Sequence, residues 1–420
     1  MKPESCLAAP TSFSDTTTRL IFTTILAATL AVLLGAPSSA WAGPKFDHVI
    51  HISVDGLRAD FLQQLIDNGR APTFARLQHE AAWTHNARTD FDFTITLPNH
   101  TSMITGRPVL TPEGFPPNTG HGHTTNGDPG PTETLHIGGG RGGCGGGRGG
   151  GEFVYIASTF DVAHDHGLST AMYASKTKFS LFDQTYNETN GRDDVIGADN
   201  GKDKIDTTVI DNSNGAAAVL IRGNGADVSG FVADMRTQHF NYAFVHLRDP
   251  DTAGHSHGWG SDDWLNAVVA VDGYLADIFA MIDADPVLKD STAVIITADH
   301  GGEGNGHSDQ TNPHNYTIPF YVWGPGVPAG ADLYELNQDT RVDPGADRPT
   351  YLDPAAQPIR NGGSGNLALD LLGLEAIPGS IINHRQDLRV TVPEPASGSV
   401  GLLTTTLLMA KRTRHPQATR

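Results

Sequence analysis

The side chains best suited to chemistry in this chain are one hydroxyl and a set of acids and histidines. Thr96 stands in TITLPNHTSMITG, just before Leu97-Pro98, where an extended segment ends and a helix is expected to begin. Pro98 suits an early helical position, and Asn99 or a neighbouring polar residue can cap the helix. The Thr96 hydroxyl would then lie at a helix N-terminus, where free N–H groups favour anions. Because a hydroxyl is a poor nucleophile at neutral pH, it needs a base or a metal ion.

Candidate metal ligands stand in other segments. Asp251 and His255 are four residues apart, which brings both side chains to one side of a helical turn or a compact loop. Asp299 and His300 directly follow an apolar run, and His307 follows them in a Gly-rich loop (GGEGNGH). Asp and His side chains together suit zinc or a similar borderline ion. One such histidine alone would be an ordinary surface residue, but the set indicates a metal centre.

The elements that must position these residues are strands of one sheet. Residues 46–54 (FDHVIHISV) and 291–298 (STAVIITA) are apolar and β-branched, so both predict buried strands, which end at Asp55 and Asp299. Open α/β sheets bind ligands at the carboxyl ends of their strands, so Asp55 joins the candidate ligands. Adjacent side chains on an extended chain diverge, so strand pairing must break at Asp299-His300 if both residues face one ion.

Strands and helices alternate along the rest of the chain. The apolar spacing over residues 262–284 predicts a long amphipathic helix. Further strands are expected over 169–175, 242–246 and 318–323, and helices over 161–167, 226–238 and, broken at Pro72, 59–80. This alternation predicts an α/β fold with a largely parallel central sheet and helices on both faces.

The composition is that of one large globular domain. The 420 residues are 38% hydrophobic and 18% charged, which allows a sizeable core. The formal net charge of −19 argues against a surface that coats nucleic acid, because phosphates would be repelled. The two cysteines are Cys6 and Cys144. Cys6 lies in a segment that we expect to be removed, so no internal disulfide is expected in the mature chain.

The first 42 residues predict a signal peptide for export. Arg19 precedes an apolar run over residues 20–34, which is too short for a comfortable membrane span. The run is followed by Ala40-Trp41-Ala42, a small-x-small cleavage pattern. We therefore expect a catalytic domain over residues 43–390 in an exported protein.

Residues 391–420 predict a sorting tail. They contain Pro393-Glu394-Pro395, an apolar stretch over residues 400–410 and basic residues after it. The order of these parts resembles the PEP-CTERM tail of Gram-negative bacteria. The resemblance implies recognition by an exosortase at the membrane and a final location at the cell surface or outside the cell.

Three segments predict loops. Residues 106–134 are rich in Pro, Gly, Thr and His and include HGHTTN. Residues 137–152 are Gly-rich and of low complexity, which predicts a flexible loop without the Lys-Ser/Thr ending of a phosphate loop. Residues 187–212 are acidic; their side chains can hold calcium, but the spacing fails the helix-loop-helix calcium pattern, so a solvated loop is favoured.

The order of the candidate residues resembles that of the alkaline phosphatase superfamily. Asp55, Thr96-Leu97-Pro98-Asn99-His100, Asp251-x-x-x-His255 and Asp299-His300-Gly301-Gly302 follow one another as they do in that superfamily. The chain is most similar to its type I phosphodiesterase/nucleotide pyrophosphatase branch. HGHTTN is similar to the His-Gly-x-x-x-Asn of that branch, and His307-Ser-Asp precedes Gly324-Pro325 as expected. The resemblance covers residues 46 to about 327 and implies an alkaline phosphatase-like fold.

The resemblance implies a site for two zinc ions, or for other divalent ions. One ion would be held by Asp251, His255 and His307, and the other by Asp55, Asp299, His300 and the Thr96 oxygen. Asn126 and the Thr96 backbone N–H would stabilise a phosphate oxygen. Two cations about 4 Å apart can stabilise the attacking and leaving oxygens of an in-line displacement, here through a phosphothreonine intermediate.

Several alternatives stay open at this stage. The substrate is expected to be a small phosphodiester or a nucleotide pyrophosphate, but a phosphomonoester suits the same metals. Only six residues, Gly301 to Gly306, separate His300 from His307, where eukaryotic members of the branch carry a long insert that shapes the substrate pocket. A sulfatase is disfavoured because Thr96 lies in a different motif, and a non-catalytic surface protein is disfavoured because the ligand set is complete. Thr94 is the alternative nucleophile, and His314 the alternative last ligand.

Overall fold

The computed structural model describes residues 46–138, 153–210, 228–353 and 357–390. The signal peptide expected over residues 1–42 and the sorting tail expected over 391–420 lie outside the described residues. The same is true of almost all of the Gly-rich segment 137–152.

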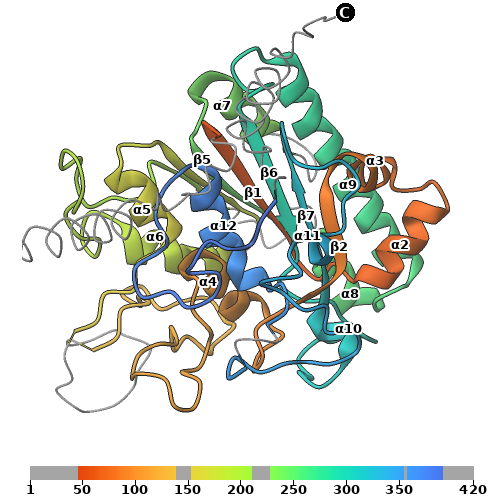
Figure 1. The fold of residues 1–420 in the computed structure, drawn as a ribbon, viewed down its shortest axis with the longest axis horizontal. Coiled ribbons are helices and arrows are strands. Elements are labelled where there is room, and N and C mark those ends of the chain that lie inside the picture. The colour runs from red at the N-terminus through yellow and green to blue at the C-terminus, as the bar shows by residue number, and fades with distance from the viewer. Residues whose placement is uncertain (1–45, 139–152, 211–227, 354–356, 391–420) are drawn as a thin grey trace, which may run out of the picture. The chain divides into compact units, whose positions relative to one another are not determined.

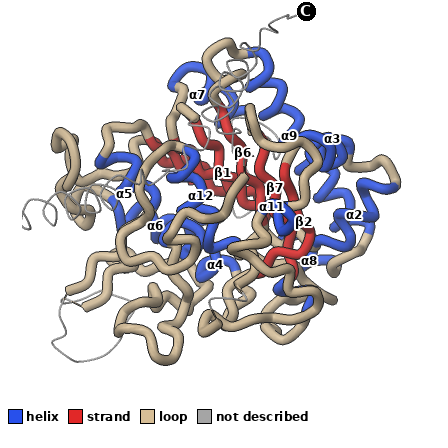
Figure 2. The backbone as a smooth tube through the Cα atoms, viewed as in Figure 1, coloured by secondary structure: helices blue, strands red, loops and turns tan. Residues whose placement is uncertain are grey.

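A seven-stranded sheet with the order β2-β7-β6-β1-β5-β3-β4 forms the centre of the described chain (Figures 1 and 2). β1 lies in the middle and pairs in parallel with both β5 and β6. β3 continues the parallel pairing to β5 and β4, whereas β7 runs antiparallel to β6 and β2. The strands are β1 (His48–Val54), β2 (Ala82–Arg88), β3 (Thr170–Ala174), β4 (Thr207–Ile210), β5 (Tyr242–Leu247), β6 (Thr292–Thr297) and β7 (Thr317–Trp323).

Helices cover both faces of this sheet. α12 packs on β1 and β6 together with α4 and α5, while α9 packs with α2, α3, α7 and α8 on the other side (Figure 1). The helices are α2 (Ala59–Asp67), α3 (Pro72–Glu80), α4 (Thr96–Thr105), α5 (Thr159–Asp165), α6 (Ser180–Tyr186), α7 (Ser229–Gln238), α8 (Asp249–His257), α9 (Asp262–Ala284), α10 (Pro313–Tyr316), α11 (Leu333–Leu336) and α12 (Ser364–Leu371). The predicted α/β fold, with a mostly parallel central sheet and helices on both faces, is confirmed.

The long helix α9 shows how the sequence pattern sets the packing. Ser261 caps it by accepting the Trp264 N–H, and the helix ends at Ala284 as predicted. Among the described helices it alone has the length and apolar composition to cross a membrane, but its apolar face packs into the protein core. Asp272 on the same helix is buried and accepts the backbone N–H groups of Thr73 and Phe74 in the first turn of α3. These N–H groups have no partner within α3, so Asp272 stabilises the start of that helix.

Two differences from the prediction lie at the edges of the sheet, and others are the unpredicted helices α6, α11 and α12. β2 was not predicted because its sequence, AWTHNAR, has no apolar alternation, and its pairing with β7 is irregular between Thr84 and Ala87. β4 lies inside the segment predicted as a solvated loop, and its side chains are only partly buried, as suits an edge strand. α5 begins two residues earlier than expected because Ser158 and Asp161 form a capping box.

Candidate metal centre

The candidate site lies where three neighbouring strands end. Asp55 follows β1, Asp299 follows β6, and Asp251 lies in α8, directly after β5. The backbone of Asp251 donates a hydrogen bond to the Asp55 carbonyl, which ties α8 to the end of β1. A Cβ at Gly56, whose φ is +71°, would lie 2.9 Å from the Asp251 Cα, so glycine permits this close approach. The three carboxylates are buried.

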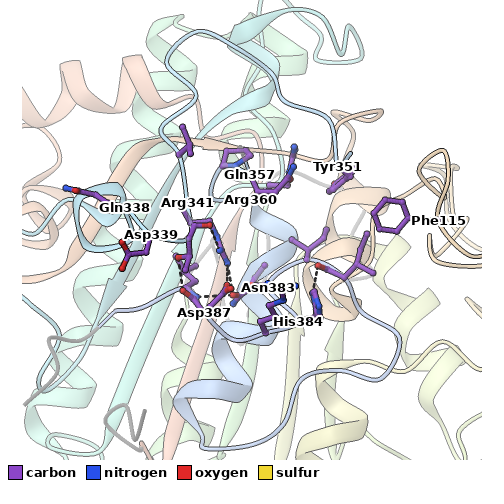
Figure 3. Close-up of a pocket in the computed structure, with 18 residues that line it drawn as sticks. Phe115, Gln338, Asp339, Arg341, Tyr351, Gln357, Arg360, Asn383, His384 and Asp387 are labelled. Atoms are coloured by element: carbon purple, nitrogen blue, oxygen red, sulfur yellow. Dashed lines mark hydrogen bonds and ion pairs between the residues drawn. The ribbon is translucent and has the colours of Figure 1, made fainter. Parts of the chain in front are cut away.

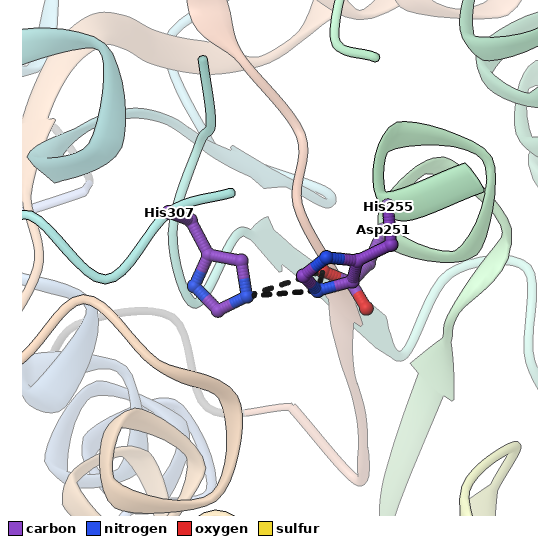
Figure 4. A group of neighbouring side chains, drawn as sticks. All are labelled: Asp251, His255 and His307. Atoms are coloured by element: carbon purple, nitrogen blue, oxygen red, sulfur yellow. Dashed lines mark hydrogen bonds and ion pairs between the residues drawn. The ribbon is translucent and has the colours of Figure 1, made fainter. Parts of the chain in front are cut away.

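Asp251, His255 and His307 form one group of converging side chains (Figure 4). Asp251 Oδ1 is 3.3 Å from His255 Nε2 and 3.6 Å from His307 Nε2. The two Nε2 atoms are 3.1 Å apart. Helical spacing brings Asp251 and His255 together on α8, and His307 faces them from the loop after β6. All three residues were predicted from the sequence as ligands of one ion.

Asp55, Asp299 and His300 form a second group beside the first. His300 Nε2 is 3.1 Å from Asp299 Oδ2 and 3.5 Å from Asp55 Oδ1. The Thr96 hydroxyl lies 3.4 Å from the same Nε2 atom. The His300 ring stacks on the His307 ring with a centroid separation of 3.6 Å, so the two groups adjoin. The structure thus brings together every residue of the two predicted ligand sets.

The three histidines are held with the same nitrogen facing inward. The Nδ1 atom of His255 lies 3.0 Å from the Asn305 carbonyl, that of His300 lies 2.8 Å from the Gly301 carbonyl, and that of His307 lies 2.6 Å from the Thr94 carbonyl. Because a carbonyl only accepts, each Nδ1 carries the proton and each Nε2 presents a lone pair to the site. A backbone carbonyl that holds the outer ring nitrogen in this way is common for histidines that bind metal ions through the other nitrogen.

The carboxylates also present unsatisfied atoms. Asp55 Oδ1, Asp251 Oδ1 and Asp299 Oδ2 are buried and, among the described residues, have no hydrogen-bond donor. Burial and the neighbouring Asp55 carboxylate raise the pKa of Asp299 well above its usual value. Burial also lowers the pKa of His300 to about 3, which keeps its ring neutral. Unpaired buried oxygens and facing lone pairs are costly unless a cation lies between them, so the donor set fits metal ions.

Lys176 was missed by the sequence reasoning and lies against both groups. Its Nζ is 2.6 Å from Asp55 Oδ2 and 2.6 Å from Asp251 Oδ2, the oxygens opposite the unpaired ones. His246 on β5 also donates to Asp55 Oδ2, at 2.9 Å. Burial would lower the pKa of Lys176, but the two carboxylates raise it above its usual value. Lys176 follows β3 with no motif around it, so only the order of the strands places it here.

Thr96 is the first residue of α4, and the cap predicted for this helix is wrong. Ile95 occupies the N-cap position without a side-chain hydrogen bond. Asn99 instead bonds with the preceding loop, accepting the Asp90 N–H and donating to the carbonyls of Phe93 and Ile95. Its side chain therefore fixes the segment that delivers Thr96 rather than the helix end.

Side chains from distant loops bond at the N-terminal end of α4. Asn126 Oδ1 accepts the Leu97 N–H at 2.9 Å, which places this predicted residue beside Thr96. Lys178 Nζ lies 2.7 Å from the Asn126 carbonyl and is a second lysine that the sequence reasoning missed. His100 Nδ1 donates to the Thr96 carbonyl. The Thr96 hydroxyl thus faces the ligand groups from a fully buried helix.

The alternative residues point elsewhere. The Thr94 hydroxyl donates to the His307 carbonyl, so it is engaged outside the ligand groups. The His314 side chain is 41% exposed and lies 4.0 Å from Glu303. His121 and His123 of HGHTTN are buried in their loop, where His121 contacts Ser102. The structure brings none of these four side chains into the ligand groups.

A third cluster of acids and a histidine joins the acidic segment 187–212 to the end of α5. His164, Asp165 and Asp194 converge, but Lys204 Nζ contacts both carboxylates from their midst. A buried lysine already supplies the positive charge that calcium would supply. The cluster instead fixes part of a segment that was predicted to be solvated.

A separate cavity of about 470 Å³ lies near the end of the described chain and contains none of the predicted site residues (Figure 3). Two of its three arginines are already paired: Arg341 contacts Asp387 and Asn383, and Arg360 donates to the Thr89 carbonyl and lies over Tyr351. The cavity therefore offers no reactive group comparable to the strand-end site.

Comparison with solved structures gives distant likenesses. An inactive variant of murine ectonucleotide pyrophosphatase/phosphodiesterase 5 in complex with AMP is 13% identical, with 81% of this chain and 99% of that chain covered and a TM-score of 0.48. A variant of the alkaline phosphatase PafA is 12% identical, with 81% and 98% covered and a TM-score of 0.49. Likenesses at this level carry no function to the present chain.

Comparison with curated proteins gives short matches. GPI ethanolamine phosphate transferase 1 of Chaetomium globosum is 37% identical over 91 residues, and that of Saccharomyces cerevisiae is 34% identical over 90 residues. The matches cover 22% and 21% of this chain but only about a tenth of the length of each transferase.

The family comparison covers the whole site. Residues 49–318 match the family described as "Type I phosphodiesterase / nucleotide pyrophosphatase". This range includes β1 to the start of β7, both ligand groups, Thr96 and Asn126. The chain belongs to the type I phosphodiesterase/nucleotide pyrophosphatase family.

Proposed function

We propose that this protein is a two-zinc hydrolase that cleaves small phosphodiesters or nucleotide pyrophosphate bonds, with Thr96 as its nucleophile. The observation that carries the proposal is the convergence of three inward Nε2 lone pairs and three unpaired carboxylate oxygens beside the Thr96 hydroxyl. Asp251, His255 and His307 would hold one ion. Asp55, Asp299, His300 and the Thr96 oxygen would hold the other. The same imidazole and carboxylate donors also accept other divalent first-row metal ions.

Each group in the site has its own role in the proposed reaction. Bound zinc would supply the positive charge that lowers the pKa of the Thr96 hydroxyl and offsets charge on the phosphoryl oxygens. Thr96 Oγ attacks phosphorus, the bond to the leaving oxygen breaks, and the phosphoryl group stays on Thr96. Water then attacks the same phosphorus and releases Thr96. The N-terminus of α4 and the Asn126 amide would stabilise the phosphoryl oxygens throughout.

A second candidate activity is phosphomonoester hydrolysis. It is favoured by Lys176 and Lys178, which place two ammonium groups at the edge of the ligand groups. A terminal phosphate carries more negative charge than a diester, so it gains more from each nearby cation. The short loop between His300 and His307 adds little to a pocket for a second ester group.

The test is chelation followed by a substrate panel. Exhaustive chelation should abolish turnover of bis-p-nitrophenyl phosphate and added zinc should restore it. The comparison with p-nitrophenyl phosphate and p-nitrophenyl sulfate then ranks diester, monoester and sulfate activity. Full turnover with no metal left by elemental analysis would overturn the proposal, and a strong preference for the monoester would replace the first activity by the second.

We further propose that residues 1–42 are removed on export and that residues 391–420 are processed by an exosortase, which leaves a catalytic domain over 43–390 at the cell surface or outside a Gram-negative cell. The proposal rests on the order of the charged, apolar and Pro-Glu-Pro segments at the two ends.

A further inference from the structure

Trp259 contacts three segments of the candidate metal centre. It lies just after α8 and is 7% exposed. Its indole N–H donates to the Gly56 carbonyl at 2.9 Å, and its backbone N–H donates to the Gly304 carbonyl at 2.8 Å. Gly56 follows Asp55, and Gly304 lies in the loop that carries His307. One residue therefore joins segments that bear ligands of both groups.

The indole ring separates the two segments that carry the first ligand group. A Cβ placed at Gly254, between Asp251 and His255, would lie 2.6 Å from the ring. A Cβ at Gly302, between His300 and His307, would lie 2.1 Å from it. Both distances are shorter than any real side chain tolerates, so glycine at these positions lets α8 and the 301–307 loop close on the indole.

The same ring also touches the two histidines. Its centroid lies 5.4 Å from that of His255 and 5.8 Å from that of His307, and both contacts are edge-on. Each histidine is thus held from two sides, by a carbonyl at Nδ1 and by the indole against its ring. The indole thus lies against both segments that carry these histidines, whose Nε2 atoms are 3.1 Å apart.

We infer that Trp259 is a positioning residue for the half of the site formed by Asp251, His255 and His307. The inference rests on the proposed function, because it assigns Trp259 a purpose within the two-zinc centre. The ring sets the separation of His255 and His307, and the N–H to Gly56 aligns that half with the half that contains Asp55. Because the ring touches His255 and His307 directly but reaches the other half only through the Gly56 carbonyl, its loss should weaken the zinc site of His255 and His307 more than the other site.

The experiment compares zinc binding in Trp259→Phe, Trp259→Leu and the wild-type protein by competition with a chromophoric chelator. Trp264→Phe is the matched control, because Trp264 is a buried tryptophan five residues away that packs on Phe61 and lies outside the site. We expect Trp259→Leu to lose tenfold or more in affinity for one of two zinc ions, as when other residues that orient metal ligands are replaced, while the second affinity changes less than twofold. Trp259→Phe keeps a ring and should lose less.

Tryptophan emission gives an independent readout in the unmodified protein. Zinc binding at His255 and His307 should change the emission of the wild type and of Trp264→Phe, and this change should be absent in Trp259→Phe. The inference is overturned if both zinc affinities fall equally, if neither falls, or if Trp264→Phe shows the same selective loss. A wild type that binds no zinc overturns the proposed function together with the inference, whereas normal zinc affinities in an active Trp259→Leu protein overturn the inference alone.

Discussion

Replacing Lys176 by methionine tests the electrostatics of the site. The lysine Nζ lies 2.6 Å from one oxygen of Asp55 and 2.6 Å from one oxygen of Asp251, and its side chain is 14% exposed. Methionine keeps much of the length of the side chain and removes the charge. In the metal-free protein, two buried carboxylates on neighbouring elements then lose the cation that they share.

The expected loss in the free energy of unfolding depends on whether zinc is bound. Removing one partner of a buried ion pair typically destabilises a protein by about 3–5 kcal/mol. Because Lys176 keeps some exposure to solvent, we take the lower end, about 3 kcal/mol, for the metal-free protein. Zinc at the opposite oxygens of the same carboxylates would replace the missing charge, so the cost in the loaded protein should fall to about 1 kcal/mol or less.

Thermal unfolding in chelator and in zinc measures both costs. Zinc should raise the melting temperature of Lys176→Met by more than it raises that of the wild type. Lys178→Met is the control, because Lys178 donates to the backbone and amide oxygens of Asn126 and not to a carboxylate. An equal loss of stability with and without zinc, or a loss no greater than that of Lys178→Met in chelator, would refute the reasoning.

Three further predictions concern the ligand set, the core and the chain ends. His307→Ala should lose one zinc and nearly all turnover, whereas His314→Ala should keep both, and elemental analysis that shows the reverse would exchange their roles. Burial raises the pKa of Asp370 to about 6, above its unfolded value near 4, so its ionisation costs stability as the pH rises between these values. The full shift corresponds to about 3 kcal/mol, which partial exposure of Asp370 reduces, so Asp370→Asn should be more stable than the wild type by about 1–2 kcal/mol at pH 7.5 and show no gain at pH 4. Thermal melts with the same difference at both pH values would contradict this. Intact mass of the protein from its natural producer should correspond to a chain without residues 1–42 and without the tail, and a full-length mass would contradict processing at both ends.

The sequence was informative wherever a local pattern determines a local structure. The continuous β-branched runs before Asp55 and Asp299 predicted β1 and β6, and the apolar spacing after Ser261 predicted both ends of α9. Because adjacent parallel strands end at one edge of a sheet, the same reasoning placed the carboxylates together. The order of the strands was needed only to say which strands are neighbours.

What the sequence did not reveal depends on contacts between distant segments. Lys176 reaches Asp55 and Asp251 because β3 pairs with β5. No sequence pattern near Lys176 predicts that pairing. From the sequence, Trp259 is an ordinary apolar residue, and only the structure shows that Gly254 and Gly302 lie against its ring. Asn99 or a neighbouring polar residue was expected to cap α4, but the Asn99 side chain bonds with the loop that precedes the helix. Tertiary structure decides each of these cases.

Turnover by Thr96→Ala tests the central claim most directly. The variant and the wild type should be loaded with zinc, shown by elemental analysis to hold equal amounts, and assayed on bis-p-nitrophenyl phosphate. We expect kcat to fall on the order of a thousandfold or more in Thr96→Ala, as when other enzymes lose a nucleophile, and to recover in part in Thr96→Ser, which keeps the oxygen. A wild-type rate in Thr96→Ala with full zinc content would contradict the account and assign the attack to another nucleophile.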